Sequence, residues 1–121
     1  MFKKFKEYNE KIGRDKAFLK ILIEFISNIA NDIDKCKCKC KIIKSPKILH
    51  ILISYDKKWK FICKQIIKYN FDIDKKQIEN ESEGKKSINF NEYNNFWFPR
   101  LTRSFKVLMY EKFDGLKQYW K

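Results

Sequence analysis

Glycine and histidine are scarce in this chain, and their scarcity excludes several kinds of active site. The 121 residues contain three glycines and a single histidine, His50. With so few glycines, the chain has no glycine-rich loop that could cradle the phosphates of a nucleotide. No serine or cysteine motif accompanies His50, so a pair of nucleophile and general base has no support. The sequence therefore predicts a protein that is not an enzyme and that uses no cofactor.

Signals for export or membrane insertion are also weak. The N-terminus is basic and an apolar run follows from Ala17, but Lys20 and Glu24 interrupt this run. No small-residue cleavage site closes the run, and it is too short to span a bilayer. Three of the four cysteines alternate with lysine, and neighbours on an extended strand are poorly placed to form disulfides. We therefore expect an intracellular, cytoplasmic protein with no membrane partner.

Acidic residues are too few to balance the basic ones. Lysine and arginine total 28 against 15 acidic residues, which gives a formal net charge of +13. Such an excess repels itself unless an anionic partner neutralises it, which favours nucleic acid or an acidic protein or ribonucleoprotein surface. Codon bias is the alternative explanation, because AT-rich codons encode lysine together with Ile, Asn, Phe and Tyr. That bias does not by itself favour lysine over glutamate.

A β-hairpin over residues 35–55 is the predicted centre of a single domain that comprises residues 1–121. Lysine and cysteine alternate from Lys35, with the period of a strand that has one wet and one dry face. A turn around Pro46 follows, and residues 49–54 then form a second strand that is apolar on both faces. Strands of that kind lie inside a sheet, whereas the lysine-rich strand is typical of a sheet edge.

Helices are predicted to cover this sheet. Residues 2–12 form a short amphipathic helix that ends at Gly13, and Asp15 then caps a longer helix with apolar residues at helical spacing as far as Ile33. Asp56 caps a third helix. Its helically spaced positions are Trp59, Ile62, Cys63, Ile66, Ile67 and Asn70.

The last third completes an α+β fold. Residues 71–78 and 87–90 are predicted strands, and residues 79–86, which include no apolar side chain, form an exposed loop between them. Pro99 suits the first turn of a last helix that continues to Trp120, although Asp114 and Gly115 could instead turn a hairpin. The prediction is helices packed on one face of a small antiparallel sheet, in the order α-α-β-β-α-β-(β)-α.

This order of elements resembles one half of a LAGLIDADG homing endonuclease. The resemblance is one of topology, because the family's helix signature of glycine and aspartate is missing from residues 15–33. Neither the activity nor the metal-binding carboxylates of that family are carried over to this chain. The resemblance implies only a degenerate homing-nuclease-like domain, as a third alternative for function.

Metal binding has weak candidates. Thiolates bind zinc, but on a strand Cys36 and Cys40 lie about 13 Å apart, too far to share one ion with bonds of about 2.3 Å to sulfur. A site would need a loop in place of the strand, or a partner in Cys63 or His50. We expect the thiols to be packing residues and no metal to bind. The weak candidates are Cys36, Cys38, Cys40, Cys63 and His50.

Two groups of basic residues are candidates for binding a partner. Lysines on the edge strand would lie about 7 Å apart, near the repeat of phosphates along a single strand, although edge lysines also serve to prevent aggregation. Two of the three arginines, Arg100 and Arg103, follow Trp97, where guanidinium groups could grip phosphate and the ring could stack on a base. The alternative is an aromatic core with solvated arginines. The strand candidates are Lys35, Lys37, Lys39, Lys41 and Lys44.

These features favour a non-enzymatic nucleic-acid-binding protein, with RNA or single strands as the partner. Sequence preference would be weak, because lysine contacts to phosphate position the ligand without reading its bases. The alternative function is a small inhibitor, encoded by a virus or mobile element, that binds a host protein or ribonucleoprotein complex.

Overall fold

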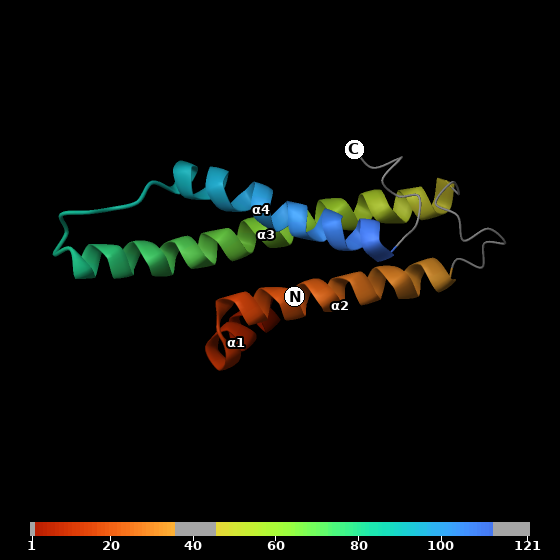
Figure 1. Cartoon of the computed structure of the whole chain (residues 1–121), viewed down its shortest axis with the longest axis horizontal. Coiled ribbons are helices and arrows are strands. Elements are labelled where there is room, and N and C mark those ends of the chain that lie inside the picture. The colour runs from red at the N-terminus through yellow and green to blue at the C-terminus, as the bar shows by residue number, and fades with distance from the viewer. Residues whose placement is uncertain (1, 36–45, 113–121) are drawn as a thin grey trace.

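Four helices make up the regular structure of the residues that the structure describes. The computed structural model describes residues 2–35 and 46–112, and these two stretches contain no strand. The helices are α1 (Phe2–Ile12), α2 (Arg14–Lys35), α3 (Pro46–Glu81) and α4 (Phe90–Lys112). Figure 1 shows α2 and α4 running antiparallel to the long α3, with α1 folded against the beginning of α2. The predicted α+β fold with an antiparallel sheet is therefore wrong, and the described residues form an all-α fold.

The second strand of the predicted hairpin is part of a helix. Residues 49–54 lie in the first turns of α3, where Ile48, Leu52 and Trp59 are buried on one face. A short run rich in Ile and Leu fits a buried strand and a buried helix equally well, so its periodicity could not distinguish them. The first strand of the hairpin falls on residues 36–45, which lie outside the described residues.

The other two predicted strands are also wrong. Residues 71–78 continue α3, with Phe71 buried and Ile73 exposed, and residues 87–89 connect α3 to α4. Helix α3 ends where Glu83 and Gly84 adopt positive φ angles of 54° and 80° and the N–H of Gly84 donates to the carbonyl of Glu79. This αL ending satisfies carbonyl groups of the last helical turn. The predicted loop over residues 79–86 therefore overlaps the end of α3.

Helix α4 begins nine residues before the proline that was expected to start it. The side chain of Asn89 caps the helix, because its Oδ1 accepts the backbone N–H groups of Asn91 at 2.8 Å and Glu92 at 3.3 Å. Pro99 consequently lies inside α4 rather than in its first turn. Residues 113–121, with the predicted end of the helix and the alternative hairpin, lie outside the described residues.

The absence of strands from residues 2–35 and 46–112 removes the basis of the resemblance to a homing endonuclease. That resemblance depended on the order of helices and strands. A degenerate nuclease domain therefore has no support from this arrangement of helices.

Trp59 of α3 is the centre of the core that joins α2, α3 and α4. Its side chain is completely buried, and its ring centroid lies 5.2 Å from that of Phe25 and 5.5 Å from that of Phe105. The indole N–H donates to the backbone carbonyl of Leu101 at 3.3 Å, so the polar atom of the ring is also satisfied. One aromatic residue from each long helix thus meets at a single point, as the helical spacing of apolar residues in α2 and α3 predicted.

Gly13 makes the turn between α1 and α2. Its φ of 91° lies in the region that glycine adopts without steric cost, and its N–H donates to the carbonyl of Asn9 at 3.1 Å. The predicted end of the first helix at Gly13 is confirmed. The turn places Phe5, which is fully buried, against the ring of Tyr69 on α3 at 6.1 Å.

Candidate nucleic-acid interface

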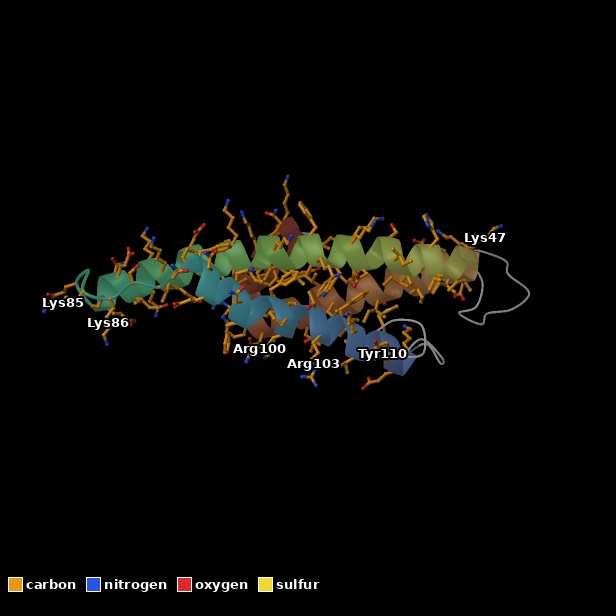
Figure 2. The ribbon with its side chains drawn as sticks, turned by 90° about the horizontal axis from the view of Figure 1, so that it is seen from above. Lys47, Lys85, Lys86, Arg100, Arg103 and Tyr110 are labelled. Carbon is orange, nitrogen blue, oxygen red and sulfur yellow. The ribbon has the colours of Figure 1, made fainter. Side chains whose placement is uncertain are left out.

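The outer face of α3 carries a row of lysines that we call the α3 basic face, consisting of Lys57, Lys60, Lys64 and Lys68. At 100° per residue Lys57, Lys64 and Lys68 lie about 140–180° around the helix from Trp59, and Lys60 lies at the flank, about 100° from it. All four are exposed. Lys57 and Lys68 are about 16 Å apart along the axis at 1.5 Å per residue. Figure 2 shows nitrogen-tipped side chains along the length of α3. The ammonium of Lys64 lies 5.9 Å from the ring centroid of Phe98 on α4, so this part of the row borders α4.

Carboxylates are absent from the middle of this face. Five lysines, the four of the α3 basic face and Lys58, lie between Asp56 and Asp72 with no acidic residue among them. Only Lys60 of the four has an ion pair within the described part of the chain, with Asp56 at 3.2 Å. The mutual repulsion of closely spaced ammonium groups is relieved when an anion binds across them.

A shallow hollow next to the α3 basic face presents aromatic rings. It lies between α2 and α3, and Tyr55, Lys57, Lys58 and Phe61 are among the residues that line it. Phe61 is 63% exposed, more than any other large hydrophobic side chain described. Proteins bind single-stranded nucleic acid through this combination, because bases stack on exposed rings and phosphates contact the ammonium groups.

Tyr55 is held in place at the rim of this hollow. Its hydroxyl donates to the carboxylate of Asp32 on α2, and its ring packs edge-on against Phe25 at 5.3 Å. The hydrogen bond to Asp32, together with burial, raises the pKa of Tyr55 to about 12. The hydroxyl therefore stays protonated at neutral pH, and the ring is a rigid wall of the hollow.

The lysines of the predicted edge strand lie mostly beyond the described residues. Lys37, Lys39, Lys41 and Lys44 fall in residues 36–45, and their part in binding stays a prediction. Lys35 is the last residue of α2 and is exposed. The α3 basic face was not among the predicted binding residues. The signal that reveals it is the spacing of three or four between lysines within the helix predicted from Asp56 to Asn70, so the sequence already contained this signal.

Trp97, Arg100 and Arg103 are all on α4, but they face different surroundings. Trp97 is 39% exposed and lines a cavity between the helices. The Cζ of Arg100 lies 3.6 Å from the ring centroid of Phe96, and its guanidinium donates to the carbonyl of that residue. Arg103 is exposed and lines the groove between α2 and α4. Figure 2 shows both arginines on the side of the molecule away from the outer face of α3.

The metal candidates are not brought together in the described structure. Cys63 is completely buried on the inner face of α3, where burial raises the pKa of its thiol, whereas His50 is exposed. Within residues 2–35 and 46–112, no group of three His, Cys, Asp or Glu side chains could hold a metal ion. Cys36, Cys38 and Cys40 lie outside those residues.

A polar junction joins the beginning of α2 to α3 and α4. Arg14 donates through two nitrogens to Asp74 at 2.9 and 2.8 Å, and the hydroxyl of Tyr93 donates to the same carboxylate at 2.6 Å. Burial raises the pKa of Asp74, but the hydrogen bonds from Arg14 and Tyr93 outweigh this effect and hold it below its ordinary value. The junction is a structural connection between three helices, with every polar atom of the carboxylate engaged.

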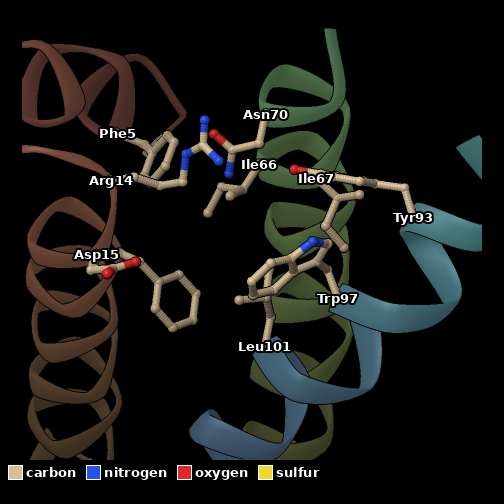
Figure 3. Close-up of a pocket in the computed structure, with 10 residues that line it drawn as sticks. Phe5, Arg14, Asp15, Ile66, Ile67, Asn70, Tyr93, Trp97 and Leu101 are labelled. Carbon is tan, nitrogen blue, oxygen red and sulfur yellow. The ribbon is translucent and has the colours of Figure 1, made fainter. Parts of the chain in front are cut away.

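Next to this junction lies a small cavity of about 70 Å³ (Figure 3). Its walls include Phe5, Ile66 and Trp97, and Asn70 lies at one end beside Arg14. Asn70 is only 8% exposed, and its Oδ1 has no hydrogen-bond partner among the described residues. An amide oxygen in that position destabilises the fold unless something donates to it.

The class that the fold defines is a small, basic, all-α protein whose longest helix, α3, is joined to α1, α2 and α4. None of the described helices is long and apolar enough to cross a membrane. Comparison of the chain with protein-family models, with curated proteins and with solved structures found no match. The surface of the molecule therefore carries the indications of its function.

Proposed function

We propose that this protein binds nucleic acid, with RNA or another single strand as the favoured partner, through the α3 basic face. The observation that carries the proposal is the row of exposed lysines from Lys57 to Lys68, with no carboxylate among them and with Phe61 exposed beside it. A strand of nucleic acid lying along α3 would place its phosphates on the lysines and its bases toward the hollow that Phe61 and Tyr55 line.

A single strand fits this surface better than a duplex. The hollow is shallow and next to the lysines, so bases must be unstacked from a helix to reach the ring of Phe61. Lysine supplies point charges rather than bidentate forks, and the α3 basic face contains no arginine, so we expect binding with little preference for sequence.

A salt titration tests the proposal. Binding of a fluorescently labelled, unstructured RNA oligonucleotide should weaken log-linearly with salt concentration, because bound phosphates release counterions. The triple variant Lys57→Glu, Lys64→Glu, Lys68→Glu should reduce the slope of that plot by about two units, at about 0.7 per phosphate contact on a single strand.

The matched control is Lys3→Glu, Lys11→Glu, Lys112→Glu, which changes the net charge equally at exposed positions on α1 and α4. It should retain most of the salt slope. Equal losses in the two triple variants would show that only net charge matters and would refute a site on α3. Negligible binding of the unaltered protein at low salt would refute nucleic-acid binding altogether.

The second candidate, an inhibitor that docks on another protein or a ribonucleoprotein, draws support from a different surface. Large apolar side chains of α2 are exposed on the side away from the core, and they are not explained by nucleic-acid binding. Capture of one stoichiometric protein partner would favour this function over the first.

A further inference from the structure

Helix α2 is apolar over more of its circumference than the core of the protein covers. Its apolar residues span an arc of roughly 240° when they are placed at 100° per residue, whereas the core-facing stripe of a surface helix needs little more than 100°. Leu19 and Ile23, at one edge of this arc, are 51% and 54% exposed. A helix that is apolar over so wide an arc is normally covered on a second side.

The exposed apolar residues of α2 form one continuous surface with their neighbours. Leu19 and Ile23 share a shallow hollow with Ile12, which is 43% exposed. Leu19 also lines the groove between α2 and α4, where Val107 on the opposite wall is 43% exposed. We call this surface, made of Ile12, Leu19, Ile23 and Val107, the α2 apolar ridge.

The groove beside the ridge corresponds to a position in a helical bundle that no helix of the described residues occupies. Helices α2 and α4 both pack on α3, but among the three long helices they make the least backbone contact with each other. A helix laid along the groove would contact α2 and α4 together and complete a four-helix bundle with α3 beneath. Partner helices bind in this way, with an apolar face in a groove between helices.

Basic side chains surround the ridge. Lys16 and Lys20 line the hollow on α2, and Arg100 and Arg103 line the groove on α4. The carboxylates nearby are Asp15 and Glu24, and Glu24 already accepts a hydrogen bond from Tyr8 at 2.9 Å. The rim is therefore positive, and it would repel a second copy of this chain, which carries a net charge of +13.

We propose that the α2 apolar ridge and the groove beside it bind an acidic amphipathic helix of a partner protein. Its apolar face packs on Leu19, Ile23 and Val107, and its carboxylates face Lys16, Lys20, Arg100 and Arg103. This surface is distinct from the α3 basic face, so the inference does not depend on nucleic-acid binding.

The test uses the full chain and a synthetic amphipathic helical peptide of leucine, alanine and glutamate, with binding followed by fluorescence anisotropy. The peptide should bind, and a version with lysine in place of every glutamate should not. The double variant Leu19→Gln, Ile23→Gln should weaken binding by roughly tenfold or more, because both side chains lie at the centre of the contact. Both residues are about half exposed, so the fold should tolerate the change.

The matched control is Ile53→Gln, Ile73→Gln, which alters two exposed isoleucines of α3 and should leave the affinity for the peptide unchanged. Three results would overturn the proposal. The first is no binding of the acidic peptide, and the second is equal binding by the two double variants. The third is a homodimer, detected by sedimentation, that dissociates in the Leu19→Gln, Ile23→Gln variant, since a second copy of the chain would then occupy the ridge.

Discussion

Arg14 and Asp74 are 60 residues apart in the sequence and form a two-point ion pair at 2.9 and 2.8 Å. The pair connects the first residue of α2 to the last third of α3, and Tyr93 of α4 donates to the same carboxylate. Planar guanidinium and carboxylate groups in this arrangement fix both distance and orientation. The ion pair therefore acts together with the Phe5–Tyr69 and Phe25–Trp59 contacts to position the N-terminal helices on α3.

Stability should depend on pH through Asp74. Because its pKa in the folded protein is depressed, Asp74 stabilises the fold above its unfolded pKa of about 3.9, and this contribution is lost as the pH falls through the folded value. The variant Asp74→Asn should be less stable than the unaltered protein at neutral pH. The difference, measured by urea denaturation, should shrink below about pH 4. A difference that stays constant down to pH 2 would contradict the assigned ion pair.

Asn70→Leu should stabilise the protein. The change removes an amide oxygen that has no partner among the described residues and replaces it with an apolar group of similar size, which is worth about 1–2 kcal/mol. Thermal unfolding followed by circular dichroism gives the measurement. Asn70→Ala is the control, since it removes the same oxygen but leaves a larger void and should gain less. Destabilisation by leucine would mean that the amide is satisfied in solution.

Pro99→Ala should also stabilise the protein. A proline inside a helix removes one backbone hydrogen bond and crowds the preceding turn, at a cost of up to about 3 kcal/mol. Pro99 is exposed, so alanine removes little packing, and we expect a gain of about 1–3 kcal/mol in chemical denaturation. An unchanged or lower stability would show that the proline is matched to a bend that the core requires.

Trp59 and Phe61 are two residues apart on α3 and should differ sharply in their contribution to stability. Trp59 is completely buried between Phe25 and Phe105, so Trp59→Ala should cost about 3–5 kcal/mol in free energy of unfolding. Phe61 is 63% exposed, and Phe61→Ala should change stability by about 0.5 kcal/mol or less. The same Phe61 variant should weaken RNA binding. Similar stability losses at both positions would contradict the assignment of the two faces of α3.

Helical periodicity was informative wherever it extended over several turns. The spacing of apolar residues predicted helices at 2–12 and 15–33, and Gly13 predicted the turn between them, as observed. The runs at 49–54, 71–78 and 87–90 were too short for period alone to separate strand from helix. Tertiary packing decided the first two of these runs, because Ile48 and Leu52 belong to the core, whereas Phe71 packs against Phe90 and Tyr93 of α4 further along the same helix.

For the candidate site too, some features could be predicted from the sequence and others only from the tertiary structure. Net charge and the lack of catalytic motifs could be read directly from composition, and they favour an anionic partner. The lysines of the α3 basic face all fall within the helix predicted from Asp56 to Asn70, so the spacing of three and four that groups them was already present in the sequence. The exposure of all four side chains required the tertiary structure.

The sequence by itself determined the basic charge, the first two helices and the aromatic side chains available for a core. The tertiary structure alone decided that α3 is one helix, that Arg14 meets Asp74 across 60 residues, and that Leu19 and Ile23 remain exposed. The physical reason is that local spacing specifies which face of an element is apolar, whereas the partner for that face comes from residues distant in the sequence.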